Sequence, residues 1–183
     1  MGKKILIVGP ESTGKSTLTV QLRQHYISQG RDVVAIEEYA REWIDTQLGG
    51  DMDRLEFDHI TGFGTKQMQL VAEASLAHSL VLSDTDAVTS LIFQRIYYED
   101  VDPALCEVAD QETWDLILFT QIDVPWVDDG QRNLSHRREE VCRLFDDELA
   151  KRGWTYVEVK GDWQERFHIA TQAIDELLQR SFT

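Results

Sequence analysis

Hydrophobic residues gather in five short runs along the chain, and within each run they stand next to one another instead of alternating with polar residues. This pattern is typical of strands that are buried on both faces of a parallel sheet. The five predicted strands cover residues Lys4–Val8, Val33–Glu38, Leu80–Asp84, Leu116–Gln121 and Thr155–Val159.

The longer segments between these runs are predicted to be helices. They cover residues Lys15–Ser28, Arg54–His78, Thr89–Tyr98, Ser135–Lys151 and Trp163–Gln179. Strands that alternate with helices from one end to the other predict an α/β fold with an open, doubly wound parallel sheet. The length of 183 residues fits a single domain over 1–183, and we see no internal repeat or linker that divides it.

The charge of the chain narrows the range of ligands. The formal net charge is -15 at pH 7. An acidic surface repels a polyphosphate backbone, which argues against nucleic acid as a partner. An anionic small molecule has to be held by a local cluster of donors and cations, because the field of the whole protein opposes it.

The sequence shows no targeting segment, no membrane span and no zinc-binding motif. The start Met1–Lys4 leads directly into the first predicted strand without a cleavage site, and no run is long enough to span a bilayer. We therefore expect a cytoplasmic protein without a membrane partner. Cys106 and Cys142 lie far apart, and the five histidines show no zinc-binding spacing, so zinc chemistry is not expected.

A phosphate-binding loop follows the first predicted strand. Residues 9–16 match the pattern G-x-x-x-x-G-K-[ST] in full, between a strand and a helix. Glycines let successive backbone N–H groups point at phosphate oxygens, and the positive end of the helix assists them. Lys15 is expected to reach the β- and γ-phosphates of ATP and Ser16 to place its hydroxyl on Mg²⁺. The predicted nucleotide-binding residues are Gly9, Pro10, Glu11, Ser12, Thr13, Gly14, Lys15, Ser16 and Thr17.

Two acidic residues close the third predicted strand. In phosphate-loop enzymes a strand beside the loop delivers a carboxylate to the magnesium shell. Asp84 stands where the strand ends and is the predicted metal-shell acid. Asp86 has two interpretations that the sequence leaves open, a substrate contact or the cap of the following helix.

The second predicted strand ends in Glu37-Glu38-Tyr39-Ala40-Arg41-Glu42. The carboxyl ends of strands in such sheets face the ligand crevice. Glu38 is therefore a candidate to accept the proton of an attacking hydroxyl, and Arg41 is a candidate to hold a phosphate or an acidic group. The alternative interpretation is a charged helix start, with Glu38 near the positive end of the helix dipole.

Residues 125–138 have the features of a lid. They follow the fourth predicted strand and combine a glycine hinge with Arg132, Arg137 and Arg138 in an acidic protein. Such a segment can fold over a triphosphate and place an arginine on the transferring phosphoryl group. Arg132 is the predicted catalytic arginine, whereas a solvated helix surface is an equal alternative for Arg137 and Arg138. Trp126 is the one tryptophan expected in the lid rather than in the core.

The loop after the fifth predicted strand, Val159–Trp163, and the nearby Arg166 are candidates to pack against a purine. A second interpretation is that Asp162 caps the last helix.

Four sequence blocks together resemble the ribosylnicotinamide kinase domain of the NadR family, a phosphate-loop domain of AAA type. They are Gly-Pro-Glu-Ser-Thr-Gly-Lys-Ser-Thr at 9–17, Glu-Tyr-Ala-Arg-Glu at 38–42, Asp-Thr-Asp at 84–86 and Pro-Trp-Val-Asp-Asp-Gly-Gln-Arg at 125–132. The resemblance covers essentially the whole chain. It implies a P-loop kinase of three layers with five parallel strands in the order 2-3-1-4-5 and a mobile lid.

The resemblance also implies a reaction. It implies transfer of the γ-phosphate of ATP to the 5′-hydroxyl of nicotinamide riboside, which yields nicotinamide mononucleotide in NAD salvage. The nucleoside would then lie between residues 38–42, the Phe57–Asp58 region and the lid. The substrate residues implied are Glu38, Tyr39, Arg41, Asp58, Asp86 and Trp126, with Lys15, Glu38, Asp84 and Arg132 as catalytic residues. Either Glu38 or Asp84 would orient the 5′-hydroxyl, and the sequence leaves this choice open.

Two departures from the family accompany this resemblance. NadR proteins usually carry an adenylyltransferase domain before the kinase domain, so a chain with the kinase domain alone is expected to make the mononucleotide but not the dinucleotide. Family members often have a tryptophan before the Glu-Tyr block that suits stacking on a pyridinium ring, and Glu37 occupies that position here.

Two rival functions remain open from the sequence. One is a P-loop kinase for another nucleoside or cofactor precursor. The other is a non-catalytic nucleotide-binding regulatory module. A GTP switch should carry N-K-x-D after a late strand, whereas the fourth strand here runs into Thr120-Gln121-Ile122-Asp123.

Overall fold

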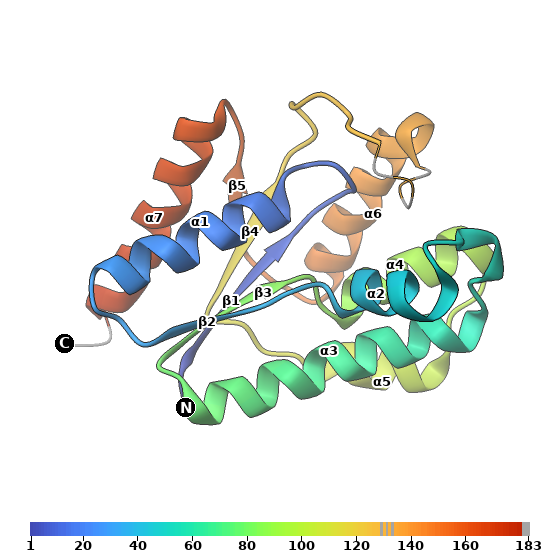
Figure 1. Cartoon of the computed structure of the whole chain (residues 1–183), viewed down its shortest axis with the longest axis horizontal. Coiled ribbons are helices and arrows are strands. Elements are labelled where there is room, and N and C mark those ends of the chain that lie inside the picture. Colours follow the sequence, from blue (N-terminus) through green and yellow to red (C-terminus); the bar gives the residue numbers. More distant parts are fainter. Residues whose placement is uncertain (129, 131, 133, 181–183) are drawn as a thin grey trace.

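The computed structural model describes residues 1–128, 130, 132 and 134–180. Its centre is one sheet of five parallel strands in the order β2-β3-β1-β4-β5, which confirms the predicted fold class and strand order. The strands are β1 Lys3–Val8, β2 Val33–Ile36, β3 Leu80–Asp84, β4 Leu116–Thr120 and β5 Val157–Val159 (Figure 1).

Helices cover both faces of this sheet and complete three layers (Figure 1). In β1, Ile5 and Ile7 point into the core beneath α1 and α7, whereas Leu6 and Val8 point into the core beneath α4, α5 and α6. The strand is therefore apolar throughout, because both of its faces are buried. The helices are α1 Lys15–Ser28, α2 Tyr39–Trp43, α3 Phe57–Ala77, α4 Ala87–Tyr98, α5 Pro103–Asp110, α6 Arg138–Lys151 and α7 Trp163–Arg180.

The structure differs from the prediction in two short helices. α2, with a turn of π-helix over Ile44–Leu48 and a 3₁₀ turn over Met52–Arg54, begins directly after Glu38, where a helix start was the alternative interpretation and no helix was predicted outright. α5 was also missed, although Asp102 caps it by accepting a hydrogen bond from the backbone N–H of Ala104. Asp followed by Pro is a helix-start signal that the short apolar pattern concealed.

Two predicted helices start later than the hydrophobic pattern indicated. α3 begins at Phe57 instead of Arg54, because Glu56 and His59 form a reciprocal capping box at its start. The segment predicted to be a helix from Ser135 opens with a 3₁₀ turn over Ser135–Arg137, and the α-helix begins at Arg138. No helix in the described part of the chain is both long and apolar enough to cross a membrane.

Close packing of α3 on its neighbours depends on one glycine. A Cβ atom at Gly64 would lie 2.6 Å from the Cδ1 atom of Leu105 in α5 and 3.2 Å from the Cα atom of Ala87 in α4. The absence of a side chain at Gly64 therefore lets α3 approach α4 and α5 closely. α3 and α4, together with α2, form the walls of the cavity described next.

Candidate active site

The phosphate-binding loop connects β1 to α1 and has the backbone conformation that its glycines allow. Gly9 and Gly14 have φ angles of 146° and 84°. A Cβ atom at Gly9 would lie 2.5 Å from the carbonyl oxygen of Thr120, and one at Gly14 would lie 2.6 Å from the ring of Trp163. Neither position accepts another residue without displacement, so both glycines serve the loop geometry.

Lys15 folds back over this loop. Its ammonium group donates hydrogen bonds of 2.9 Å to the carbonyl oxygens of Gly9 and Pro10. The Thr13 hydroxyl donates to the Pro10 carbonyl oxygen at 2.8 Å and lies 2.7 Å from the hydroxyl of Thr120. The loop is thus tied to the end of β4, and Lys15 lies where a lysine can bind a phosphate once it leaves the carbonyl groups.

Ser16 and Asp84 meet at the end of β3. The Ser16 hydroxyl donates a 2.5 Å hydrogen bond to Oδ2 of Asp84. The Oδ1 atom of Asp84 is buried and has no hydrogen-bond partner among the described residues. A hydroxyl and a buried carboxylate oxygen without a partner are hard oxygen donors, so the two residues fit Mg²⁺.

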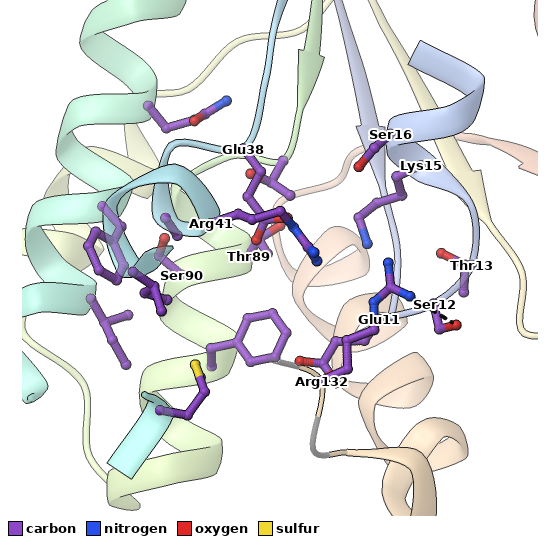
Figure 2. Close-up of a pocket in the computed structure, with 18 of the residues that line it drawn as sticks. Glu11, Ser12, Thr13, Lys15, Ser16, Glu38, Arg41, Thr89, Ser90 and Arg132 are labelled. Atoms are coloured by element: carbon purple, nitrogen blue, oxygen red, sulfur yellow. Dashed lines mark hydrogen bonds and ion pairs between the residues drawn. The ribbon is translucent and has the colours of Figure 1, made fainter. Parts of the chain in front are cut away.

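One cavity extends from the phosphate-binding loop into a chamber between α2, α3 and α4 (Figure 2). Figure 2 shows Lys15 and Arg41 projecting into it from opposite walls. The part of the cavity between the helices is lined mostly by apolar side chains, whereas polar and charged side chains line the part next to the phosphate-binding loop. The cavity is lined by Glu11, Ser12, Thr13, Gly14, Lys15, Ser16, Thr17, Glu38, Ala40, Arg41, Ile44, Met52, Leu55, Ile60, Phe63, Gln67, Thr85, Thr89, Ser90, Phe93, Tyr97 and Arg132.

Charged groups of both signs lie near one another where the loop meets the chamber. The carboxylates are Glu11, Glu38 and Asp84, and the cations are Lys15, Arg41 and Arg132. Burial, and then the charge of Glu38, raise the pKa of Asp84 to about 6, against the opposing effect of Lys15. Burial also raises the pKa of Glu11, while the backbone N–H of Leu134 and the charge of Lys15 act against it. Glu38 itself forms an ion pair with Arg41, with 3.8 Å between oxygen and Nε.

The described part of the predicted lid lies against the phosphate-binding loop. Arg132 donates a 2.7 Å hydrogen bond to the carbonyl oxygen of Val127, and the N–H of Val127 donates at 2.7 Å to the Ser12 hydroxyl. The N–H of Leu134 donates to Glu11 at 3.3 Å. Of the segment predicted as the lid, residues 129, 131 and 133 lie outside the described residues.

The two other arginines of the predicted lid have separate environments. Arg138 donates to the carbonyl oxygens of Val124 and Ser12 at 2.9 and 3.4 Å, so it also connects the segment to the loop. Arg137 instead forms an ion pair with Glu140, with 2.6 Å between nitrogen and oxygen.

Four of the six predicted substrate residues lie outside the cavity lining, namely Tyr39, Asp58, Trp126 and Asp86. The ring of Tyr39 packs edge-on against Phe63, with 6.3 Å between the ring centroids, in a hydrophobic cluster with Ile44 and Ile60. Asp58 is exposed at the start of α3. Trp126 lies beneath the guanidinium group of Arg138, 5.7 Å from the ring centroid. The structure therefore brings Glu38 and Arg41 into the cavity but not the other four.

Asp86 has the second of its two predicted roles, that of a helix cap. Its Oδ1 atom accepts hydrogen bonds from the backbone N–H and the hydroxyl of Thr89 at 2.7 and 2.6 Å, and the side chain is not part of the cavity lining. Buried Glu112 lies next to it and accepts from the N–H of Ala87 at 2.8 Å and from the indole of Trp114 at 2.8 Å. Asp86 thus fixes the start of α4, the helix that carries Thr89 into the cavity.

Glu37 occupies the position at which family members often have a stacking tryptophan, but in this structure the position does not face the cavity. Glu37 is exposed and is absent from the cavity lining. Aromatic rings enter the chamber from other elements, namely Phe63 of α3 and Phe93 and Tyr97 of α4. The rings of Phe93 and Tyr97 stack with their centroids 5.9 Å apart.

The loop after β5 is held by capping and by a buried arginine. Asp162 accepts from the backbone N–H groups of Gln164 and Glu165 at 2.8 and 2.9 Å, which confirms the capping interpretation. Arg166, 2% exposed, donates at 2.9 Å to the carbonyl oxygen of Thr13 and pairs with Asp123. It therefore joins the phosphate-binding loop to the segments that follow β4 and β5.

The residues that build the chamber have no distinctive sequence pattern. Phe63, Gln67, Phe93 and Tyr97 lie in α3 and α4, where apolar residues at helical spacing are predicted to be core. Gln67 gave the one available signal, since it is a polar residue on the buried face of α3. Helical periodicity separates buried from exposed positions but does not separate the core from a cavity wall.

A family model described as an AAA domain (AAA_28) matches residues 4–166. The trifunctional NAD biosynthesis/regulator proteins NadR of Escherichia coli (strain K12) and Salmonella typhimurium are each 28% identical to this chain over 180 residues. Each match covers 96% of this chain but 43% of the relative, so the chain spans less than half the length of these relatives. This similarity confirms the predicted resemblance.

Solved structures agree with this result. A NadR protein in complex with NR has a TM-score of 0.79 and 25% identity, and one with NAD and AMP-PNP has a TM-score of 0.77 and 25% identity. Each covers 96% of this chain, which covers 49% of the NadR chain. Thymidylate kinase from Ehrlichia chaffeensis has a TM-score of 0.68 at 15% identity, with 96% and 98% of the two chains covered, and shows the shared fold alone.

Proposed function

The chain belongs to the AAA domain family whose model covers residues 4–166, and from this premise we propose that it is an ATP-dependent kinase of nicotinamide riboside. In the proposed reaction the 5′-hydroxyl oxygen bonds to the γ-phosphorus, the bond from that phosphorus to the β–γ bridging oxygen breaks, and ADP leaves. The products are ADP and nicotinamide mononucleotide, as in NAD salvage.

One observation carries the proposal. The cavity that begins at Lys15 and Ser16 continues into a chamber with Glu38 and Arg41 at its entrance (Figure 2). A site that only binds a nucleotide needs no second compartment, whereas a kinase needs one to hold the acceptor in line with the γ-phosphate. The resemblance to NadR proteins, one of which is solved in complex with NR, supports the choice of acceptor.

The residues of the chain take separate parts in this reaction. Lys15 and the N–H groups of the phosphate-binding loop bind the triphosphate. Ser16 and Asp84 would hold Mg²⁺, which neutralises charge on the phosphate oxygens when it is bound. Arg132 approaches from the lid side and stabilises the charge of the transferring group.

Glu38 and the chamber position the acceptor. The Glu38 carboxylate accepts a hydrogen bond from the 5′-hydroxyl and takes its proton as the new bond forms. The rings of Phe63, Phe93 and Tyr97 offer faces on which the cationic pyridinium ring stacks. Phosphoryl transfer requires little covalent help, so positioning and charge supply most of the acceleration.

The test is a coupled assay of ATP consumption with a panel of nucleosides and Mg²⁺, with the product identified by mass. The proposal expects ADP release that depends on nicotinamide riboside and a product heavier by one phosphate. Stimulation by another nucleoside alone would assign a different acceptor. Absence of stimulation by any member, with ATP still bound, would support a regulatory nucleotide-binding module instead.

A Lys15→Ala variant serves as the negative control, because the phosphate-binding loop then lacks its cation. Lys66→Ala is its matched partner, since Lys66 lies on α3 outside the cavity lining and donates at 3.2 Å to Gln69. Turnover should fall by at least about 100-fold in the first variant and stay unchanged in the second.

A further inference from the structure

We infer that Gln67 of α3 is a positioning residue that fixes the metal-shell acid Asp84 relative to the segment carrying Glu38. Gln67 is 2% exposed and bonds to the carboxyl end of β3 and to the first residue of α2. The part of this inference that concerns Asp84 depends only on magnesium nucleotide binding, and the part that concerns Glu38 rests on the proposed function.

The side-chain amide of Gln67 both donates and accepts hydrogen bonds. Its Nε2 atom donates to the Ser83 hydroxyl and to the carbonyl oxygen of Asp84, both at 3.1 Å. Its Oε1 atom accepts from the backbone N–H of Tyr39 at 3.0 Å. One side chain therefore connects the end of β3 to the residue that directly follows Glu38.

The turn after β3 needs such support, because its backbone is strained. Thr85 has a φ angle of 77°, a conformation that is a clear outlier for a β-branched residue. The Ser83 hydroxyl donates to the carbonyl oxygen of Thr85 at 2.7 Å, and the N–H of Thr85 donates to the carbonyl oxygen of Ile7 at 3.1 Å. Strained backbone persists only where several contacts determine it, and Gln67 adds hydrogen bonds to Ser83 and Asp84, the two residues before Thr85.

The strained turn begins at the carboxylate that meets Ser16. Asp84 lies between Ser83 and Thr85, so the direction of its side chain depends on the backbone that Gln67 and Ser83 hold. If the turn relaxes, the carboxylate loses its fixed position opposite the Ser16 hydroxyl. Partners that orient a metal ligand typically change metal affinity by about 10–100-fold when they are removed.

Gln67 also lines the cavity, so direct contact with the acceptor is the competing role. Both hydrogens of its amide nitrogen already have acceptors, and its oxygen already has a donor. A substrate contact through the amide nitrogen would break one of these buried bonds. The geometry thus favours a structural connection to Asp84 and Tyr39 over substrate recognition.

The experiment measures magnesium linkage directly. Calorimetric titration of the whole chain with a non-hydrolysable ATP analogue, with and without Mg²⁺, gives the factor by which Mg²⁺ tightens nucleotide binding. Gln67→Met keeps the length of the side chain and removes its hydrogen bonds. We expect this factor to fall by about 10-fold, while affinity for the analogue without Mg²⁺ stays the same because Lys15 and the loop are unchanged.

Two further variants separate positioning from general damage. Val71→Ala removes buried volume from the same helix, where Val71 is 1% exposed, without touching β3 or α2 bonds. It should lower the melting temperature and leave the Mg²⁺ factor unchanged. Ser83→Ala removes the hydroxyl that accepts from Gln67 and donates to the carbonyl oxygen of Thr85. It should lower the Mg²⁺ factor as Gln67→Met does, so the test remains available if the methionine variant does not fold.

An unchanged Mg²⁺ factor in folded Gln67→Met and Ser83→Ala would overturn the inference, as would an equal loss in Val71→Ala. This binding readout needs no acceptor, so it stands even where the kinase assay shows no activity. With an active acceptor, Gln67→Met should also raise the acceptor KM, because the segment with Glu38 loses its bond to α3, while the ATP KM at saturating Mg²⁺ changes little.

Discussion

Ser16 and Asp84 share a 2.5 Å hydrogen bond although 68 positions separate them in the chain. The contact follows from strand order, because β1 and β3 are neighbours and Ile7 pairs in register with Asp84. The start of α1 and the end of β3 therefore meet at the same edge of the sheet. The buried, unpaired Oδ1 atom of Asp84 makes this pair the strongest candidate for the magnesium site among the described residues.

Asp84→Asn should remove magnesium dependence with little change in shape. The asparagine side chain would still accept the Ser16 hydrogen bond through its amide oxygen but would carry no charge for a cation. We expect turnover to fall by at least about 100-fold and nucleotide binding to become insensitive to Mg²⁺. Steady-state kinetics and nucleotide titrations over a Mg²⁺ series would measure these two effects.

Asp58→Asn is the control for this change, because Asp58 is exposed and outside the cavity lining. It should retain the turnover and the Mg²⁺ dependence of the unaltered chain. A similar loss in both variants would contradict the assignment of the magnesium site to Asp84.

Arg132 and Arg137 provide a second matched pair. Arg132 lines the cavity, whereas Arg137 forms an ion pair with Glu140 on the surface. Arg132→Ala should lower kcat by about 100-fold or more with a smaller effect on the ATP KM, because the charge it opposes develops in the transition state. Arg137→Ala should change kcat by less than about 2-fold, since exposed ion pairs contribute little. Normal turnover in Arg132→Ala would remove this residue from the catalytic set.

Two glycines of α3 should respond to alanine in opposite directions. A Cβ atom at Gly64 would meet Leu105 at 2.6 Å, whereas one at Gly62 would meet nothing within 4 Å. Gly64→Ala should destabilise the fold by about 1–3 kcal/mol through overpacking. Gly62→Ala should stabilise it by about 0.5–1 kcal/mol, because alanine favours a helix. Urea denaturation measures both, and equal signs would contradict the packing of α3 on α5.

Buried Glu112 should make stability depend on pH. Burial, and then the charge of Asp86, hold the pKa of Glu112 well above its ordinary value of 4.5. The folded chain therefore keeps a proton that the unfolded chain releases as the pH rises above 4.5. Since the folded state binds more protons in this range, the free energy of unfolding falls as the pH rises, until Glu112 ionises in the folded chain as well.

Glu112→Gln should weaken this pH dependence, because the amide does not titrate. The comparison is urea denaturation of both proteins from pH 5 to about pH 8. The variant should show a smaller decrease in the free energy of unfolding over the series, although it also loses one hydrogen bond to Ala87 or Trp114. Parallel pH profiles for the two proteins would contradict the prediction.

The sequence anticipated the parts of the site that depend on local chemistry. Residues 9–16 predicted the loop, because glycine, lysine and serine at fixed spacing between a strand and a helix meet local conformational demands. Asp84 was identified because it ends a buried strand, and the structure places it against Ser16. Asp86 stayed ambiguous, since a capping acid and a ligand-binding acid have the same sequence appearance at a helix start.

The sequence by itself determined that strands alternate with helices and that a phosphate-binding loop follows β1, because hydrophobic periodicity and glycine spacing act over short distances along the chain. Only the tertiary structure decided which side chains form the chamber. Phe63 and Phe93 come from different helices, and Gln67 bonds to β3 and α2 at once. Such positions depend on how helices pack across a twisted sheet, and that packing also left Glu37 exposed, away from the cavity.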